Sequence, residues 1–194
     1  MLYKLAHILR DKMGWLWNLI EWWNSWLFSL RYGKKLKSFT FTTIPEGYNV
    51  VPMKDVPTDE MVVFFEHQPE EAYDFFHPHG FDVRSIKRLQ GNKAFLAYVL
   101  KDAANGQIAG YCFNRSFFHG VGYRGRMVDI NYRGKGLGTA MNKMLNEVGF
   151  GIGLRLFETV SKDNLASYRS AMSASNVEVV KELPHNEIYL EILP

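Results

Sequence analysis

Three glycines and two basic residues come together between an apolar run and the next helical pattern. Gly134, Gly136 and Gly138 alternate there with Arg133 and Lys135. The start of a helix leaves backbone N–H groups unpaired and carries a partial positive charge, so it attracts anions. Glycine lets a phosphate approach that backbone without a Cβ in the way. The turn therefore predicts a phosphate site, although a tight strand-to-helix turn with basic side chains explains the same residues.

The glycine spacing excludes two common phosphate motifs. No Gly-Lys-Ser/Thr sequence ends the turn, and its glycines do not follow the spacing of a dinucleotide-binding fingerprint. The pattern of Arg133, Gly136 and Gly138 instead resembles the pyrophosphate loop of the GNAT superfamily of acyl-CoA-dependent N-acyltransferases. The stretch 160–167 resembles that family's second conserved segment, where an asparagine opens a helix. The order of elements over residues 48–192 also resembles this fold, with acetyl-CoA as the implied acyl donor.

By position, the resemblance implies a cofactor-binding role for three segments. The strand residues Arg126, Met127 and Val128 would offer backbone groups to the pantetheine arm, because this strand splays from its neighbour in the family. Asn164 would hydrogen-bond the pantetheine or the acyl region. The pyrophosphate would be wrapped by the residues of the turn, which are Arg133, Gly134, Lys135, Gly136, Leu137, Gly138 and Thr139.

Acyl transfer also needs a proton for the departing thiolate. The family places a tyrosine seven residues after the asparagine, but that position is Ala171 here. Tyr168 lies four residues after Asn164 and three before Ala171, so helical spacing puts all three on one side. Tyr168 is thus the candidate general acid, and packing against a neighbour is the alternative for this side chain.

The general base is sought among the titratable side chains near the turn. Glu158 is the candidate, because a carboxylate within an apolar strand needs a specific reason to be there. Asp129, just before the turn, is interpreted as a structural or solvated carboxylate. His77 and His79, in a break rich in phenylalanine, either line an acceptor pocket or pack within a loop. No carboxylate or cysteine follows them at ligand spacing, so no metal site is predicted.

The elements that must position these residues are read from hydrophobic periodicity. Residues 48–192 predict an α+β fold. The resemblance to the GNAT superfamily implies a mixed, mostly antiparallel sheet flanked by helices. Asn105-Gly106 predicts a tight hairpin between two of the strands. Strands are expected over 48–53, 94–100, 108–113, 124–132, 154–160, 177–181 and 187–192, and helices over 57–65, 69–76, 82–89, 137–148 and 164–174.

The first 40 residues differ in character from the rest. Residues 13–30 predict an extra Trp-rich amphipathic helix, and Gly33 with the lysines after it predicts its end and a linker. Three interpretations stay open: packing on its own domain or on a second subunit, lying in a membrane interface, or spanning the membrane. The last would carry Glu21 near the centre of the bilayer, at a considerable cost. The helix has a narrow polar stripe formed by Gly14, Asn18, Glu21, Ser25 and Ser29.

Charge and composition bound the class of protein. The chain has 194 residues, and 47% hydrophobic with 22% charged residues excludes wholesale disorder. Residues 1–40 hold seven basic and two acidic side chains, which gives this segment a net charge of +5. Because the whole chain has a net charge of +3, residues 41–194 carry −2. This uneven placement argues against a nucleic-acid binder. The single cysteine, Cys112, is consistent with a reducing compartment.

Together these features predict two units, residues 1–40 as helix and basic linker and residues 41–194 as the acyltransferase domain. The predicted activity transfers acetyl from acetyl-CoA to the primary amine of a small molecule such as an amino sugar or a cell-envelope precursor. A protein N-acetyltransferase and a catalytically inactive CoA-binding regulatory or scaffold module are the alternatives. The predicted location is the cytoplasm, with residues 13–30 contacting the inner face of the membrane or a second copy.

Overall fold

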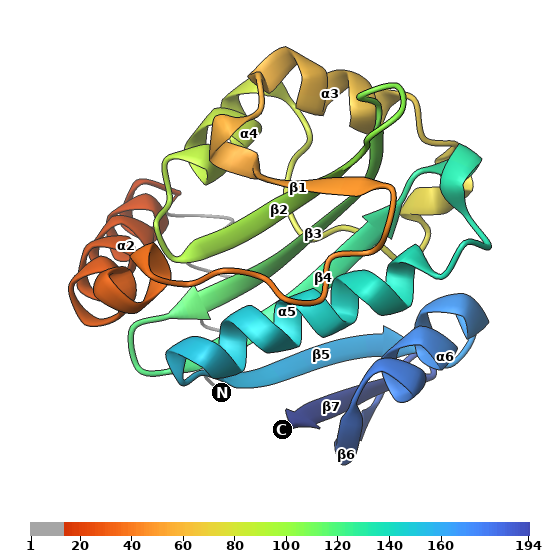
Figure 1. Cartoon of the computed structure of the whole chain (residues 1–194). Coiled ribbons are helices and arrows are strands. Elements are labelled where there is room, and N and C mark those ends of the chain that lie inside the picture. The colour runs from red at the N-terminus through yellow and green to blue at the C-terminus, as the bar shows by residue number, and fades with distance from the viewer. Residues whose placement is uncertain (1–13) are drawn as a thin grey trace.

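The computed structural model describes residues 14–194. Within them a seven-stranded sheet runs in the order β1-β2-β3-β4-β5-β7-β6 (Figure 1). Every neighbouring pair is antiparallel except β4 with β5, so the predicted α+β, mostly antiparallel fold is confirmed. The strands are β1 (Tyr48–Pro52), β2 (Phe95–Asp102), β3 (Ile108–Phe117), β4 (Val121–Val128), β5 (Arg155–Ser161), β6 (Asn176–Leu183) and β7 (Glu187–Leu193).

Helices cover both faces of the sheet and bury it in separate core clusters. On one face, side chains of α3 and α4 pack with Tyr111, Phe113 and Met127 of the central strands. On the other face, α2, α5 and α6 pack against the sheet. The helices are α2 (Gly14–Lys37), α3 (Thr58–Glu66), α4 (Val83–Gln90), α5 (Leu137–Ile152) and α6 (Leu165–Ala174), with short 3-10 turns η1 (Met53–Asp55), η2 (Glu70–Tyr73) and η3 (Ile130–Tyr132).

The helix α5 carries the predicted glycine turn at its amino end. Its apolar residues Leu137, Met141, Leu145 and Val148 recur every three to four positions, which gives one continuous buried face. Gly153 ends the helix in the left-handed conformation, with φ of +93°, a common cap for the last turn. The position of the turn is therefore fixed by a helix that is anchored along its whole length.

The strands β4 and β5 pair only at their first residues. Three parallel pairs join them, from Val121 with Arg155 to Tyr123 with Phe157, and no further pair forms in the described chain. Beyond Tyr123 the β5 side of β4 is open, while its other side stays bonded to β3 as far as Val128. The strands thus separate toward the glycine turn, as the predicted fold requires.

Two sequence predictions are corrected in this region. The third strand was expected to run to Tyr132, but β4 ends at Val128 because the Asp129 carboxylate caps η3 by accepting from the backbone N–H of Asn131 at 2.8 Å. The helical piece expected over 69–76 is only the short turn η2. The Asn105-Gly106 turn between β2 and β3 is confirmed, with Gly106 at φ of +74°.

The amino-terminal helix is longer than predicted and packs on the domain. It continues through Gly33 to Lys37, because Leu36 packs on the core and the Lys35 Nζ donates to the carbonyl of Ile152 at 3.1 Å. Met13, the first residue of the predicted helix, lies outside the described residues. Across residues 14–194, no helix is long and apolar enough to cross a membrane. The boundary near residue 40 stays a prediction.

Candidate functional site

A cleft of about 620 Å³ opens where β4 and β5 separate. It runs from the glycine turn, past the open side of β4, to the η2 segment on the opposite face of the sheet. All the predicted site residues except Lys135 and Tyr168 line it. Those that do are Arg126, Met127, Val128, Arg133, Gly134, Gly136, Leu137, Gly138, Thr139, Glu158 and Asn164.

The glycine turn has the geometry that an anion site requires. Gly134 and Gly136 have φ of +77° and +76°, a region that residues with a Cβ rarely adopt. No described atom lies within 4 Å of a Cβ built at either position, so the space above the turn is free. No described side chain caps the start of α5, so its first backbone N–H groups have no side-chain partner, and the residues that carry them line the cleft.

The two basic residues of the turn lie differently. Arg133 lines the cleft, whereas the Lys135 ammonium sits 4.7 Å from the centre of the Tyr132 ring, outside the lining. Free N–H groups, glycines and Arg133 together suit a negatively charged group such as a pyrophosphate. The turn therefore fits the diphosphate of acetyl-CoA, with less direct help from Lys135 than the sequence suggests.

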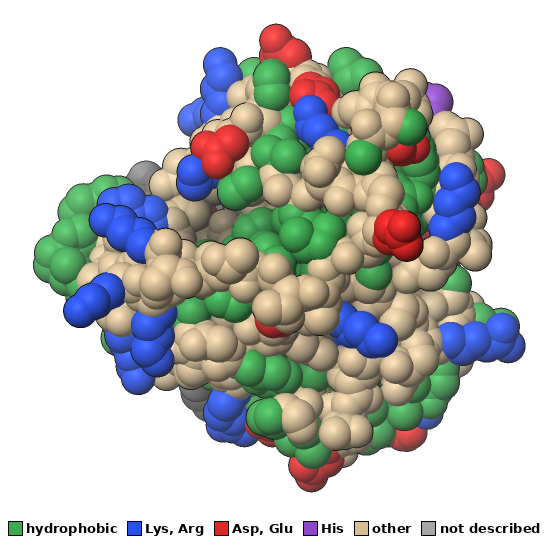
Figure 2. Space-filling model, viewed as in Figure 1, with side chains coloured by type: hydrophobic (Ala, Val, Ile, Leu, Met, Phe, Trp, Pro, Cys, Tyr) green, Lys and Arg blue, Asp and Glu red, His purple; other side chains and the backbone are tan. Residues whose placement is uncertain are grey.

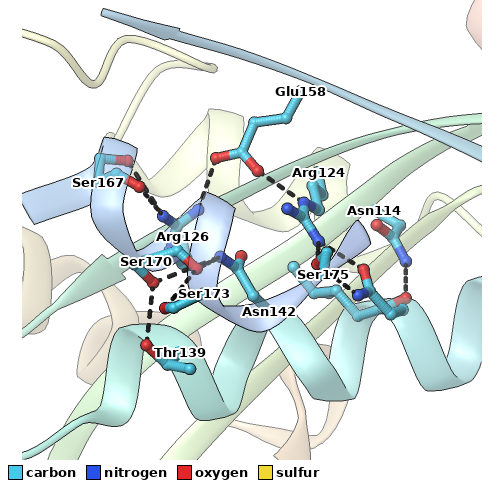
Figure 3. A network of polar contacts seen from close by, with 12 residues as sticks. Asn114, Arg124, Arg126, Thr139, Asn142, Glu158, Ser167, Ser170, Ser173 and Ser175 are labelled. Atoms are coloured by element: carbon cyan, nitrogen blue, oxygen red, sulfur yellow. Dashed lines mark hydrogen bonds and ion pairs between the residues drawn. The ribbon is translucent and has the colours of Figure 1, made fainter. Parts of the chain in front are cut away.

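Glu158 forms ion pairs with two arginines, Arg124 and Arg126, whose guanidinium groups both point toward its carboxylate (Figure 3). The Arg124 Nε donates to one of its carboxylate oxygens and the Arg126 Nη1 to the other, both at 2.6 Å. Burial raises the pKa of the Glu158 carboxyl, but the charges and hydrogen bonds of Arg126 and Arg124 outweigh it, so this pKa lies below its ordinary value. Glu158 is consequently ionised at neutral pH and a weak proton acceptor.

The arginines extend this cluster to both helices of the cleft. Arg126 donates through Nη2 to the carbonyl of Ser167 at 2.9 Å, which ties β4 to the first turn of α6. Arg124 donates through Nη1 to Asn146 of α5 and to Ser175 after α6. Its other terminal nitrogen is buried without a partner in the described chain. The sequence analysis missed Arg124, which lies two residues before Arg126 on β4 and therefore on the same face of the strand.

The helix α6 begins at the predicted asparagine. The Asn164 side chain accepts from the backbone N–H of Ser167 at 3.1 Å and caps the helix. Tyr168 is not among the cleft-lining residues and packs against the core cluster under α6. Ala171 is fully buried in the same cluster. The side of α6 that faces the cleft presents Ser167 and Ser170 instead.

The wall of the cleft away from the glycine turn is formed by a segment that the sequence did not single out as a whole. Glu71, Phe75 and Phe76 line it together with Thr159 of β5. The exposed Glu71 lies in η2, two residues after Pro69. The sequence predicts the start of a helix there, but it assigns Glu71 no functional role. Phe75 and Phe76 belong to the phenylalanine-rich break that contains His77 and His79. These two phenylalanines line the cleft, and the two histidines do not.

Two of the other titratable candidates, His79 and Asp129, have structural partners, and the exposed His77 does not line the cleft. His79 packs among aromatic rings, and its Nδ1 and Nε2 lie 2.8 Å from the Gly80 carbonyl and 2.9 Å from the Tyr111 hydroxyl. Burial lowers the pKa of His79 to about 4, so the ring is neutral. Asp129 is buried and accepts from Gln68 at 2.7 Å. Within residues 14–194, no group of three or more histidines, cysteines or carboxylates could hold a metal ion.

Comparisons with solved structures relate this geometry to known proteins. The GNAT domain of S. lividans PAT has a TM-score of 0.64 and 14% identity, covering 75% of this chain and 89% of that one. A ribosomal-protein-S5-alanine acetyltransferase from Vibrio fischeri has a TM-score of 0.59 and 16% identity, covering 79% and 93%. The aminoglycoside acetyltransferase AAC(6')-Ib, solved with coenzyme A and kanamycin, has a TM-score of 0.55 and 15% identity, covering 74% and 93%.

Sequence comparison adds the family. No curated protein matches the chain by sequence. The family model of the Acetyltransferase (GNAT) family matches residues 56–171, which include the strands β2 to β5, the glycine turn and most of α6. The chain therefore belongs to the GNAT acetyltransferase family and is an acyl-CoA-dependent N-acetyltransferase with acetyl-CoA as its donor.

Proposed function

We propose that this enzyme acetylates the primary amine of a small molecule, and that this molecule is an amino sugar or another cell-envelope precursor. The observation that carries the proposal is the uninterrupted cleft from the glycine turn to the wall formed by Glu71, Phe75 and Phe76. A diphosphate and an amine can be bound at its two ends at the same time. Transfer between them then becomes an intramolecular step.

The donor is held by the chain's own backbone in this proposal. Free N–H groups at the start of α5 and the guanidinium of Arg133 bind the pyrophosphate. The open side of β4, from Arg126 to Val128, offers alternating N–H and C=O groups to the amide-rich pantetheine arm. Bound in this way, acetyl-CoA supplies an activated acetyl group as a thioester.

The acceptor end suits a compact cationic amine. The exposed carboxylate of Glu71 attracts an ammonium group, and the rings of Phe75 and Phe76 pack on the apolar side of a sugar ring. Glu158 acts here through Arg126, as a positioning residue that holds β4 and α6 together, rather than as a base. The lone cysteine, Cys112, is buried and reduced, which fits a cytoplasmic reaction.

Two other functions each have one supporting observation. The likeness to a ribosomal-protein-alanine acetyltransferase favours a protein acceptor. The burial of Ala171, where the family resemblance implies a proton donor, favours a CoA-binding module without catalysis.

The experiment is an acceptor screen on the purified full chain with acetyl-CoA. Thiol release is followed against amino sugars, nucleotide-linked amino sugars, aminoglycosides and peptides with free amino termini. We expect release with at least one sugar amine, and a higher KM for that amine in the Glu71→Gln variant with unchanged affinity for acetyl-CoA. Release with peptides alone would instead assign a protein acceptor, and CoA binding without release from any amine would assign the module.

A further inference from the structure

The helix α2 turns its polar side toward the protein. Asn24 is bonded through both side-chain atoms to the end of β3, donating to the Ser116 carbonyl and accepting from the Phe118 N–H, each at 2.9 Å. The Ser25 hydroxyl accepts from the backbone N–H of Lys93 at 2.9 Å. The Glu21 carboxylate lies 3.5 Å from the Arg115 guanidinium. Glu21 and Ser25 of the polar stripe, together with Asn24, thus dock the helix on the domain, the reverse of the usual arrangement on a soluble domain.

Two aromatic residues complete this docking. Phe28 and Tyr32 follow the stripe on the same side of the helix and are 0% and 3% exposed, within the core cluster under α5. The inner side of α2 is therefore fixed, and the opposite side must face outward.

The outward side of α2 is apolar. Trp22 is 58% exposed and Leu30 is 66% exposed, and between them the same side presents Trp23 and Trp26. Leu19 extends it by a turn toward the amino end. Figure 2 shows hydrophobic side chains gathered at the left edge of the molecule over α2, with basic side chains beside them. A contiguous apolar face of this kind marks a binding surface on a soluble protein.

Positive charge continues along this face. Lys34 and Lys37 follow Leu30 at helical spacing and are exposed on the same side. The single acidic residue of α2, Glu21, is directed inward to Arg115. A second copy placed on this face would meet lysines without carboxylates, whereas an anionic surface would complement them. Tryptophan and lysine together are the residues that the interface of a bilayer favours.

We propose that α2 is a membrane-docking helix, which lies in the headgroup region of an anionic bilayer with Leu19, Trp22, Trp23, Trp26 and Leu30 inserted and Lys34 and Lys37 on lipid phosphates. Its inner side stays bonded to the domain, so the helix lies along the surface. No residue of α2 lines the catalytic cleft, so docking leaves the cleft free. The proposal does not depend on the identity of the acceptor.

The chain carries its own probe for this docking. All five tryptophans stand between positions 15 and 26, so tryptophan emission reports on α2 alone. We expect a blue shift of the full chain on vesicles of phosphatidylcholine with about one third phosphatidylglycerol, and little shift on phosphatidylcholine alone. The Lys34→Glu/Lys37→Glu variant should bind the anionic vesicles at least tenfold more weakly.

A flotation assay tests the apolar half of the surface. The Trp22→Ser/Trp23→Ser/Trp26→Ser variant should no longer float with anionic vesicles, while retaining wild-type affinity for acetyl-CoA as a check of folding. The matched control is Val179→Ser/Val180→Ser, which removes exposed apolar side chains from β6 and should float as wild type does. Failure of the wild type to float would overturn the proposal. The proposal would also be overturned if light scattering showed that the wild type is a stable dimer and that the tryptophan variant is a monomer.

Discussion

Glu158 shows how strongly a neighbouring pair of charges defines what a residue can do. A carboxylate in an apolar strand beside a cleft is a reasonable candidate base, and its position in the lining fits that prediction. Its two hydrogen-bonded arginines nevertheless lower its pKa, so proton abstraction at neutral pH is disfavoured. Its charge is needed for another purpose, because the buried Arg124 would be left unpaired without it. The same carboxylate that suggested catalysis thus supports the cleft wall.

Gly136 allows the predicted phosphate site to be tested alone. Gly136→Val puts a branched Cβ into the open space above the turn at φ of +76°, and we expect acetyl-CoA affinity to fall at least tenfold, about 1.4 kcal/mol. Isothermal titration measures it. The control is Gly47→Val, which has a similar φ of +80°, equally open surroundings and no place in the cleft. Equal CoA affinity in both variants would contradict the site.

Tyr168 is tested by removal of its hydroxyl. Because its ring packs under α6 rather than in the cleft, we expect Tyr168→Phe to keep turnover within about threefold of wild type. General acid catalysis typically contributes 10²–10⁴-fold, so a loss of about that size would establish the role that the sequence suggests. Tyr48→Phe, which changes a half-buried tyrosine of β1 that also does not line the cleft, controls for the loss of a packed hydroxyl. Turnover is measured with an acceptor from the screen.

At the scale of elements, the cleft depends on an interruption of the sheet. The pairing of β4 and β5 stops after Tyr123, and Arg126 then crosses the gap to Ser167 on α6. On the far end of the same strands, α2 is bonded to the end of β3 and to α5. One end of the central strands is therefore closed by a helix, and the other is open for binding.

The inner side of α2 should contribute to stability and its outer side should not. Phe28→Ala empties a fully buried position, and we expect the free energy of unfolding to fall by about 3–5 kcal/mol. Trp22→Ala on the outer side should change it by less than about 1 kcal/mol. Urea denaturation followed by circular dichroism compares the two. A loss below about 1 kcal/mol for Phe28→Ala would mean that α2 docking adds little to the fold.

For the whole molecule, the half-buried neutral His79 links stability to pH. It lies in the aromatic core between η2 and the sheet, with a pKa lowered to about 4 by burial. An unfolded histidine titrates near 6.5, so the unfolded state binds the proton first as the pH falls. The contribution of the neutral His79 to the free energy of unfolding is therefore fully present above about pH 6.5, and it is lost as the pH falls toward 4.

This linkage gives a measurable slope. Between pH 7 and pH 5 we expect wild type to lose about 2 kcal/mol of unfolding free energy, before most carboxylates titrate. His79→Gln, which cannot gain the proton, should be less stable at pH 7 but should show a much flatter dependence. Thermal denaturation in matched buffers measures both. Parallel curves for the two proteins would assign the slope to other groups.

The sequence by itself determined most of the elements and predicted an anion site at the glycine turn. Hydrophobic periodicity located α5 and the strands within a few residues, because burial of one side repeats locally along the chain. The glycine turn was recognisable because positive φ and close phosphate approach both require glycine at fixed spacing. Asn164 was placed correctly as the start of α6, since capping is also a local property.

The tertiary structure decided which way each side chain faces. The rotation of α6 put Ser167 and Ser170 in the cleft and Tyr168 against the core, a choice that spacing within one helix leaves open. Glu158 could be assigned partners only once β4 and β5 were aligned. For α2, the sequence showed two unlike sides, but the outward position of the tryptophans depends on hydrogen-bond partners about 90 residues away. Such long-range contacts have no local signature, because they arise only when distant segments pack together.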